Sequence, residues 1–177
     1  MSGHNKWSQI KNKKGVADLK RGKIFSKLLR AISIAAKSEA NPEFNPRLRS
    51  AIDTAKQNQV PLDNIERAIN KASEEKNLED VVIEAYGPEG SALIIEAITD
   101  NTNRTINEIK SILSDNGAKM ATQGSVMWAF EQSANGERTA KFPKNVSDES
   151  KEKIAKLISA IEEHDDVQKI ISDLAGN

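Results

Sequence analysis

The spacing of apolar residues changes near Asn77, and this change limits the possible folds more than any other feature of the sequence. Before it, apolar residues recur every three or four positions, as they do in amphipathic helices. After it, the runs VVIEAYG (81–87) and ALIIEAIT (92–99) are typical of strands, and the turn GPEG joins them. The pattern predicts an α+β chain with two domains, residues 1–76 and residues 77–177.

The first domain is predicted to be a basic three-helix domain. Its first helix is expected to begin at Gly15 and to end at the segment NPEFNP, after a flexible arm over residues 1–14. Asn45 is suited to cap the second helix, with Pro46 in its first turn, and Pro61 introduces the third. The apolar residues that recur at helical spacing in the first helix are Val16, Leu19, Ile24, Leu28, Ile32 and Ala35.

The second domain is predicted to be a two-layer α/β domain with a mostly antiparallel sheet. One helix is expected to begin in the polar cluster TDNTNRT and to end at Gly117, and another is expected to begin at Ser147. The segment SVMWAFEQ (125–132) alternates large apolar with smaller or polar residues, which predicts a strand with one buried face. Asn135 and Gly136 predict a hairpin that returns through RTAKFP, and DVQKIISDL offers a final short strand.

Charge is distributed unevenly between the two predicted domains, although the whole chain has a formal net charge of zero. Residues 1–76 contain 16 basic and 8 acidic side chains, whereas residues 77–177 contain 10 and 18, so the net charges are +8 and −8. Nine of the basic side chains lie among the first 30 residues, where Asp18 is the single acid. A lobe with this charge is suited to bind polyanions, and a solvated basic helix face is the alternative.

The basic segment supplies the candidate contacts to nucleic acid. Lysine and arginine side chains neutralise phosphates, and each such contact makes binding salt-dependent. Trp7 is suited either to stack on an exposed base or to close the first helix onto the bundle as a hydrophobic staple. No segment resembles a helix-turn-helix reading head, which favours recognition of backbone and shape over base sequence. The phosphate-neutralising candidates are Lys6, Lys11, Lys13, Lys14, Lys20, Arg21, Lys23, Lys27 and Arg30.

A second candidate anion site lies in the segment TDNTNRT (99–105), where a strand leads into a helix. Free backbone amides at a helix start favour an anion and Arg104 adds a positive charge, which makes Asn101, Asn103 and Arg104 the candidate residues. The alternative is a capping cluster, in which Asp100 or Asn101 satisfies the helix start and Arg104 pairs with a neighbouring acid. The capping cluster is the favoured interpretation.

Catalytic and metal-binding motifs find little support in the sequence. The chain has no cysteine, which excludes disulfides, thiolate zinc sites and a cysteine nucleophile. His164 lies in the acidic segment EEHDD, but consecutive ligands do not share a helix face, so a solvated helix end is favoured over a metal site. Phosphate-loop, dinucleotide and nucleophile-elbow motifs are absent. We therefore expect no enzymatic activity, no cofactor, no metal and no small-molecule substrate.

Several segments together resemble the YebC/PmpR family, whose members include the mitochondrial translational activator of cytochrome c oxidase. They are SGHNKWSQIKNKK, RGKIFSKLLR, VPLDNIERAI, YGPEG, ALIIEAITDNTNRT and NGAKMATQGSVMWAF, in the order found in that family. The resemblance implies a helical N-terminal domain, α/β lobes after it, and a non-enzymatic regulator of gene expression. The nucleic-acid contacts that it implies here are His4, Lys6, Trp7, Lys11, Lys13, Lys14, Arg21, Lys23, Lys27 and Arg30.

The sequence departs from this family in one large way. Typical members have a further α/β lobe after the strand GSVMWAF, whereas only residues 131–141 separate Phe130 from Phe142 here. A short Asn-Gly hairpin is expected in place of the lobe. The basic helical domain is unaffected by this departure.

Family members have been described either as DNA-binding transcriptional regulators or as ribosome-associated factors that assist translation of difficult sequences such as proline runs. The missing base-reading head favours a translation factor that binds ribosomal RNA, with a DNA-binding regulator as the alternative and a protein-interaction scaffold as the second alternative. We expect a monomer in the cytoplasm rather than the mitochondrial matrix. No apolar run approaches the length of a membrane span.

Overall fold

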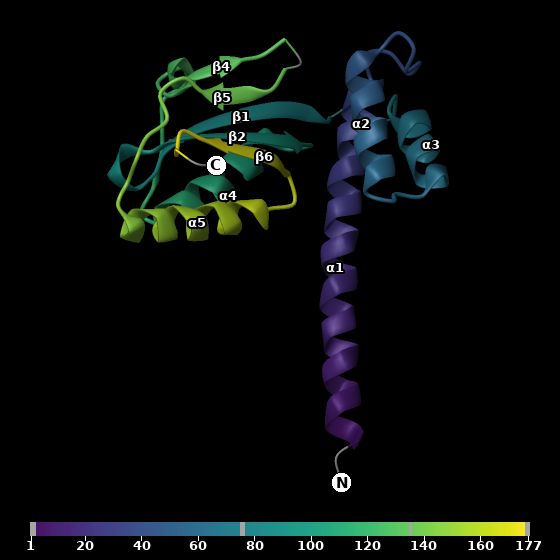
Figure 1. Ribbon diagram of the computed structural model, residues 1–177. Helices are drawn as coiled ribbons and strands as arrows, with labels where there is room; N and C mark the ends of the chain where they lie inside the picture. Colours follow the sequence, from purple (N-terminus) through teal and green to yellow (C-terminus); the bar gives the residue numbers. More distant parts are fainter. Residues whose placement is uncertain (1–2, 75–76, 135, 176–177) are drawn as a thin grey trace. The chain divides into compact units, whose positions relative to one another are not determined.

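The computed structural model describes residues 3–74, 77–134 and 136–175, with side chains from Gly15 onward within these ranges. The chain forms two compact units, Met1–Lys76 and Asn77–Asn177 (Figure 1). Among the described residues, no helix combines the length and the apolar character that a membrane crossing requires.

The first unit contains three helices: α1 (Gly3–Ala36), α2 (Pro46–Gln57) and α3 (Leu62–Lys71). Helices α2 and α3 lie beside the C-terminal part of α1 (Figure 1). There the three helices bury one apolar cluster, which includes Ile32, Ala35, Leu48, Ile52, Ala55, Ile65 and Ala68. The apolar residues of this cluster recur at the helical spacing seen in the sequence.

Helix α1 begins at Gly3, so the predicted start at Gly15 is wrong. Its 34 residues correspond to a length of about 51 Å. A glycine costs a helix only about 1 kcal/mol relative to alanine, and α1 contains no proline to interrupt it. The segment 15–24 is exposed, including Val16, Leu19 and Ile24, so these residues of the apolar pattern are not part of the core.

Asn45 joins the end of α1 to the start of α2. Its side-chain oxygen accepts the Leu48 amide hydrogen at 3.0 Å, which makes it the N-cap predicted from the sequence. Its side-chain nitrogen donates to the carbonyl oxygens of Ala35, at 2.8 Å, and Glu39, at 2.7 Å. The buried carboxamide therefore satisfies one free amide of α2 and two carbonyl groups around the end of α1.

Asn45→Ala should lower the free energy of unfolding of the helical unit by about 2 kcal/mol, because it leaves these three backbone groups without their partner. Thermal unfolding followed by circular dichroism measures the change. Asn58→Ala is the matched control, since Asn58 is exposed and its side-chain amide donates to the carbonyl oxygen of Thr54 at the end of α2. Equal losses in the two variants would contradict the role given to Asn45.

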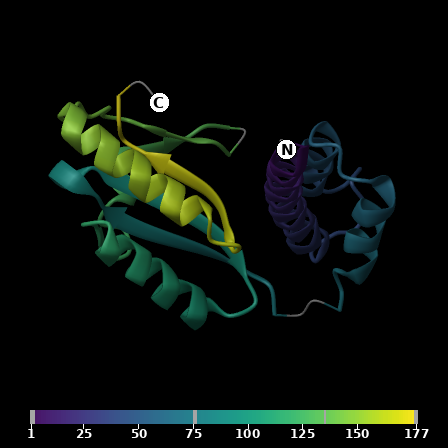
Figure 2. The ribbon, with the colours of Figure 1, turned by 90° about the horizontal axis from the view of Figure 1, so that it is seen from below.

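The second unit is built on a four-stranded antiparallel sheet with the order β3-β1-β2-β6. The strands are β1 (Glu79–Tyr86), β2 (Ala92–Thr99), β3 (Lys119–Met120) and β6 (Val167–Ser172). Helices α4 (Thr102–Asp115) and α5 (Asp148–Glu162) cover one face of this sheet (Figure 2). The α+β fold class predicted from the sequence is confirmed, with its mostly antiparallel sheet, but a further layer on the second face of this sheet makes the predicted two-layer arrangement incomplete.

The opposite face of the sheet is covered by residues 126–130 and by Ala140. A short 3-10 helix, η2 (Met127–Ala129), leads into a separate two-stranded hairpin of β4 (Phe130–Gln132) and β5 (Arg138–Ala140) (Figure 1). Val126, Ala129 and Phe130 pack on this face beside Ile94 and Ile171. Because both of its faces are covered, β2 is buried along almost its whole length.

The predicted single strand over 125–132 is wrong, although the predicted hairpin after it is present. The carboxylate of Glu84, on β1, accepts the amide hydrogens of Gly124, Val126 and Met127. These bonds hold the backbone in a compact turn, which cannot also pair as a strand. Val126 and Phe130 are buried as expected, but Trp128 is 63% exposed.

Candidate nucleic-acid interface

The basic section of α1, defined here as residues 15–30, is the main candidate interface. Lys20, Arg21 and Lys23 are exposed, while Lys27 and Arg30 are half-buried where α1 approaches α2 and α3. Asp18 is the only acidic residue of this section. The resulting surface is suited to polyanions, and its segment 15–24 is left exposed by α2 and α3.

Helical geometry places four of these cations on one side of α1. Lys20, Lys23, Lys27 and Arg30 follow one another at intervals of three or four residues, so they form one stripe. At 1.5 Å per residue the stripe is about 15 Å long. A stripe of this kind can follow a run of phosphates along one strand of nucleic acid.

Arg21 lies outside this stripe and is held by an aromatic ring. Its guanidinium carbon is 5.1 Å from the centroid of Phe25, which packs against the core of the helical unit. A cation–π contact of this kind orients the guanidinium plane without using its N–H donors. The donors of Arg21 therefore stay available for bidentate contact with a phosphate.

Six predicted contacts lie on the first turns of α1: His4, Lys6, Trp7, Lys11, Lys13 and Lys14. Their side chains lie outside the described residues. Whether Trp7 stacks on a base or packs on its own chain therefore stays an open prediction.

The segment around Arg104 has the geometry of a capping cluster. The side chain of Asn101 accepts the Arg104 amide hydrogen at 3.1 Å and caps α4. The Arg104 guanidinium lies 2.9 Å from both Asp166 and Asp100, and hydrogen bonds to them raise the pKa of Arg104. These contacts support the capping cluster, which is the interpretation favoured from the sequence. The anion site, with Asn103 as one of its residues, stays a prediction that these contacts do not support.

His164 belongs to the same network and has a partner that the sequence did not indicate. Its Nε2 lies 2.8 Å from the Glu108 carboxylate, and its Nδ1 accepts the Asp166 amide hydrogen. Glu108, His164 and Asp166 thus bring three potential metal ligands within 4.8 Å of one another. The Arg104 guanidinium contacts both carboxylates and already supplies the positive charge that they require.

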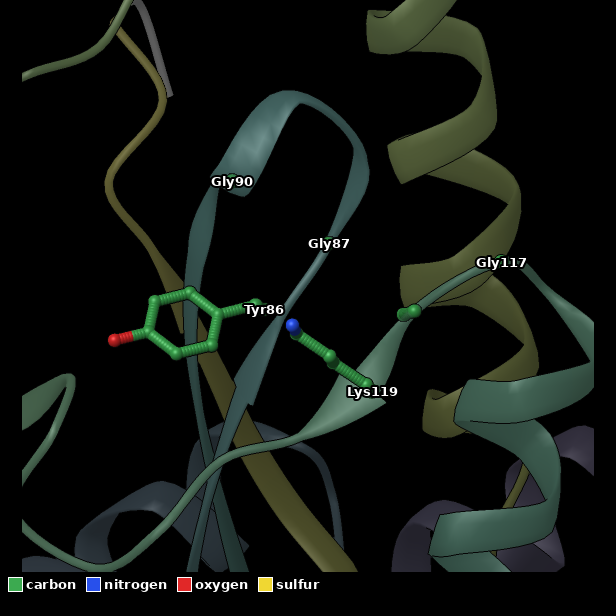
Figure 3. A pocket seen from close by; sticks show the side chains of 6 residues that line it. Tyr86, Gly87, Gly90, Gly117 and Lys119 are labelled. Carbon is green, nitrogen blue, oxygen red and sulfur yellow. The ribbon is translucent and has the colours of Figure 1, made fainter.

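A hollow of about 620 Å³ lies at the turn between β1 and β2 (Figure 3). Tyr86 and Lys119 line it together with Gly87, Gly90 and Gly117. The Gly90 amide donates to the carbonyl oxygen of Gly87, and the Gly117 amide donates to that of Ser114. Neither amide hydrogen is therefore available to a bound phosphate.

Comparisons with known proteins connect both units to one family. The family model described as TACO1/YebC protein N-terminal domain matches residues 5–75, and the one described as TACO1/YebC second and third domain matches residues 78–141. A probable transcriptional regulatory protein of Trichlorobacter lovleyi is 52% identical over 136 residues, which are 75% of this chain and 55% of that protein. Another from Geotalea uraniireducens is 49% identical over 150 residues, 82% of this chain and 59% of that protein.

The chain therefore spans little more than half the length of these curated relatives. A solved structure has a comparable fold: the crystal structure of a conserved hypothetical protein from Aquifex aeolicus. It matches with a TM-score of 0.81 and 30% sequence identity, over 89% of this chain and 91% of that chain.

Proposed function

Because the chain belongs to the TACO1/YebC family, as its sequence motifs indicated, we propose that it is a non-enzymatic, nucleic-acid-binding regulator of gene expression. The observation that carries this function is the exposed basic section of α1. Relatives named probable transcriptional regulatory proteins support the regulatory role at the level of gene expression.

RNA is the favoured target within this proposal. In a helix-turn-helix protein, the first residues of the second helix read base edges in the major groove. Helices α2 and α3 have the matching short connection, but α3 presents Asp63 and Glu66 at its exposed start. Carboxylates at this position repel the phosphates on either side of the groove. Duplex DNA would therefore be bound through α1 and without strong base selectivity.

The mechanism we propose is electrostatic docking of α1 on folded RNA. Each lysine or arginine that neutralises a phosphate releases counterions, which favours binding at low salt. The second unit has a net charge of −8, so it opposes non-specific association of its own surface with nucleic acid. The resemblance to ribosome-associated family members suggests a cytoplasmic monomer that binds ribosomal RNA and assists translation of sequences such as proline runs.

Competition between nucleic acids tests this assignment. With a labelled, folded ribosomal RNA fragment, the logarithm of the affinity should fall linearly with the logarithm of the salt concentration. The slope should be about −2 or steeper. At about −0.7 per phosphate on a single strand, this corresponds to three or more neutralised phosphates. Unlabelled RNA should compete better than random duplex DNA of equal length. A DNA operator that competes at least about 10³-fold better than random duplex would instead support a sequence-specific transcriptional regulator.

A further inference from the structure

Two large aromatic side chains are exposed together on the second unit. Trp128 is 63% exposed and Phe142 is 66% exposed, and their ring centroids lie 6.3 Å apart at an interplanar angle of 46°. Exposed apolar groups that cluster in this way commonly mark a binding surface. The two residues flank the β4–β5 hairpin, and we name them the aromatic pair.

The tryptophan of the aromatic pair is held in a fixed orientation. Its indole N–H donates to the carbonyl oxygen of Ser125 at 2.8 Å, and the hydroxyl of Tyr86 donates to the same oxygen at 2.9 Å. The backbone beside it is held by the Glu84 carboxylate, which accepts the Met127 amide hydrogen at 2.8 Å. Because the indole is held at its edge, its ring is preorganised for stacking at little cost in entropy.

The aromatic pair borders a hollow of about 350 Å³ that also contains Tyr86, Pro143 and Lys144. Tyr86 and Gly90 line this hollow and also the neighbouring one that contains Lys119 (Figure 3). The two hollows are therefore neighbours that share Tyr86 and Gly90. Aromatic rings line them, with Lys119 in one hollow and Lys144 in the other.

The segment that carries the aromatic pair has a net charge opposite in sign to that of the unit as a whole, although the Glu89 carboxylate lies near Lys144. Residues 116–147 contain four basic and two acidic side chains, a net charge of +2, within a unit of net charge −8. Asp173, which also lines the hollow, is buried and its carboxylate accepts the Ala92 amide hydrogen. Lys144 is fixed beside the pair by donating to the Glu89 carbonyl oxygen. The basic side chains of this segment are Lys119, Arg138, Lys141 and Lys144, of which Arg138 pairs with Glu96.

We propose that the aromatic pair is a stacking platform for unpaired bases of a single-stranded nucleic acid, with Lys119, Lys141 and Lys144 beside the phosphates. Aromatic rings that alternate with lysines are the chemistry of single-strand binding, in which rings stack on bases and cations follow the backbone. Exposed rings held in place with lysines beside them favour this ligand over an apolar protein partner. This inference extends the proposed function by adding a second contact that is separate from α1.

The fluorescence of Trp128 provides a direct test in the full chain. Trp7→Phe leaves Trp128 as the only tryptophan, so quenching by a short uridine oligonucleotide reports stacking at this site. We expect quenching that saturates with the single strand and is much weaker with the corresponding duplex. In the same background, Phe142→Leu should weaken oligonucleotide affinity about tenfold, whereas Phe44→Leu, at a residue 75% exposed in the first unit, should have no effect.

Two further variants separate this inference from the proposed function. Lys20→Glu with Lys23→Glu should weaken binding of folded RNA but leave quenching of Trp128 by saturating oligonucleotide intact. Trp128→Leu, measured with a labelled oligonucleotide, should lose affinity for the single strand with little change for the duplex. Absence of quenching, or equal single-strand affinity of wild type and Trp128→Leu, would overturn the proposal and favour a protein-binding surface. Neither result would depend on whether α1 binds folded RNA.

Discussion

Replacement of Lys20, Arg21 and Lys23 by glutamate should weaken binding of folded ribosomal RNA by about a hundredfold or more at low salt. Each substitution removes a contact to phosphate and adds a repulsive charge on the exposed section of α1. Fluorescence anisotropy with a labelled RNA fragment measures the effect. Because these three side chains lie outside the apolar core, the variant should keep its helical content and melting temperature.

The matched control is a variant that makes the same change of net charge, but on the second unit. Lys110, Lys156 and Lys169 are exposed lysines on α4, α5 and β6. Their replacement by glutamate should reduce RNA affinity much less than the α1 variant does. Equal losses would mean that net charge, rather than the basic section of α1, determines binding.

Glu84→Gln should lower the free energy of unfolding of the second unit by about 3 kcal/mol. Glu84 is 4% exposed, and its two carboxylate oxygens accept hydrogen from Gly124, Val126 and Met127. Glutamine replaces one of those oxygens by an NH2 group, which points its own hydrogens at backbone N–H donors. Denaturant unfolding measures the loss, and Glu131→Gln, at an exposed position of β4, is the control.

The same variant should change how stability depends on pH. Burial raises the pKa of the Glu84 carboxyl, but the three amide hydrogens outweigh this effect and hold the pKa below its ordinary value of 4.5. The stabilisation by the carboxylate is therefore complete above 4.5 and is lost as the pH falls through the lower, folded-state pKa. The stability difference between wild type and Glu84→Gln should be constant near neutral pH and shrink in acid. A difference that grows below pH 4.5 would contradict this role.

Features that depend on neighbouring residues could be predicted from the sequence. Asn45 and Ser147 cap the helices whose starts were assigned from them, and Asn101 caps the helix whose start was assigned to the cluster TDNTNRT. These assignments were possible because a cap bonds an amide only three residues ahead. The runs that form β1 and β2 pair across the turn that joins them. Such features need no knowledge of the rest of the fold.

Features that depend on distant residues were missed. The compact turn at Trp128 is imposed by Glu84, which is more than 40 residues earlier in the sequence. The pairing of His164 with Glu108 spans 56 residues and requires α4 and β6 to be placed first. The start of α1 was missed for another reason: residues 3–14 are mostly polar, so the apolar spacing that indicates a helix does not mark them. The charge separation still indicated which part of the chain is the candidate interface.

Crosslinking in cells, followed by sequencing of the bound nucleic acid, tests the proposed function most directly. The wild-type chain should recover ribosomal RNA at defined positions, and the Lys20, Arg21 and Lys23 to glutamate variant should recover little of it. Recovery of defined genomic DNA sites by the wild type, or equal recovery of RNA by both chains, would contradict RNA binding through the basic section of α1.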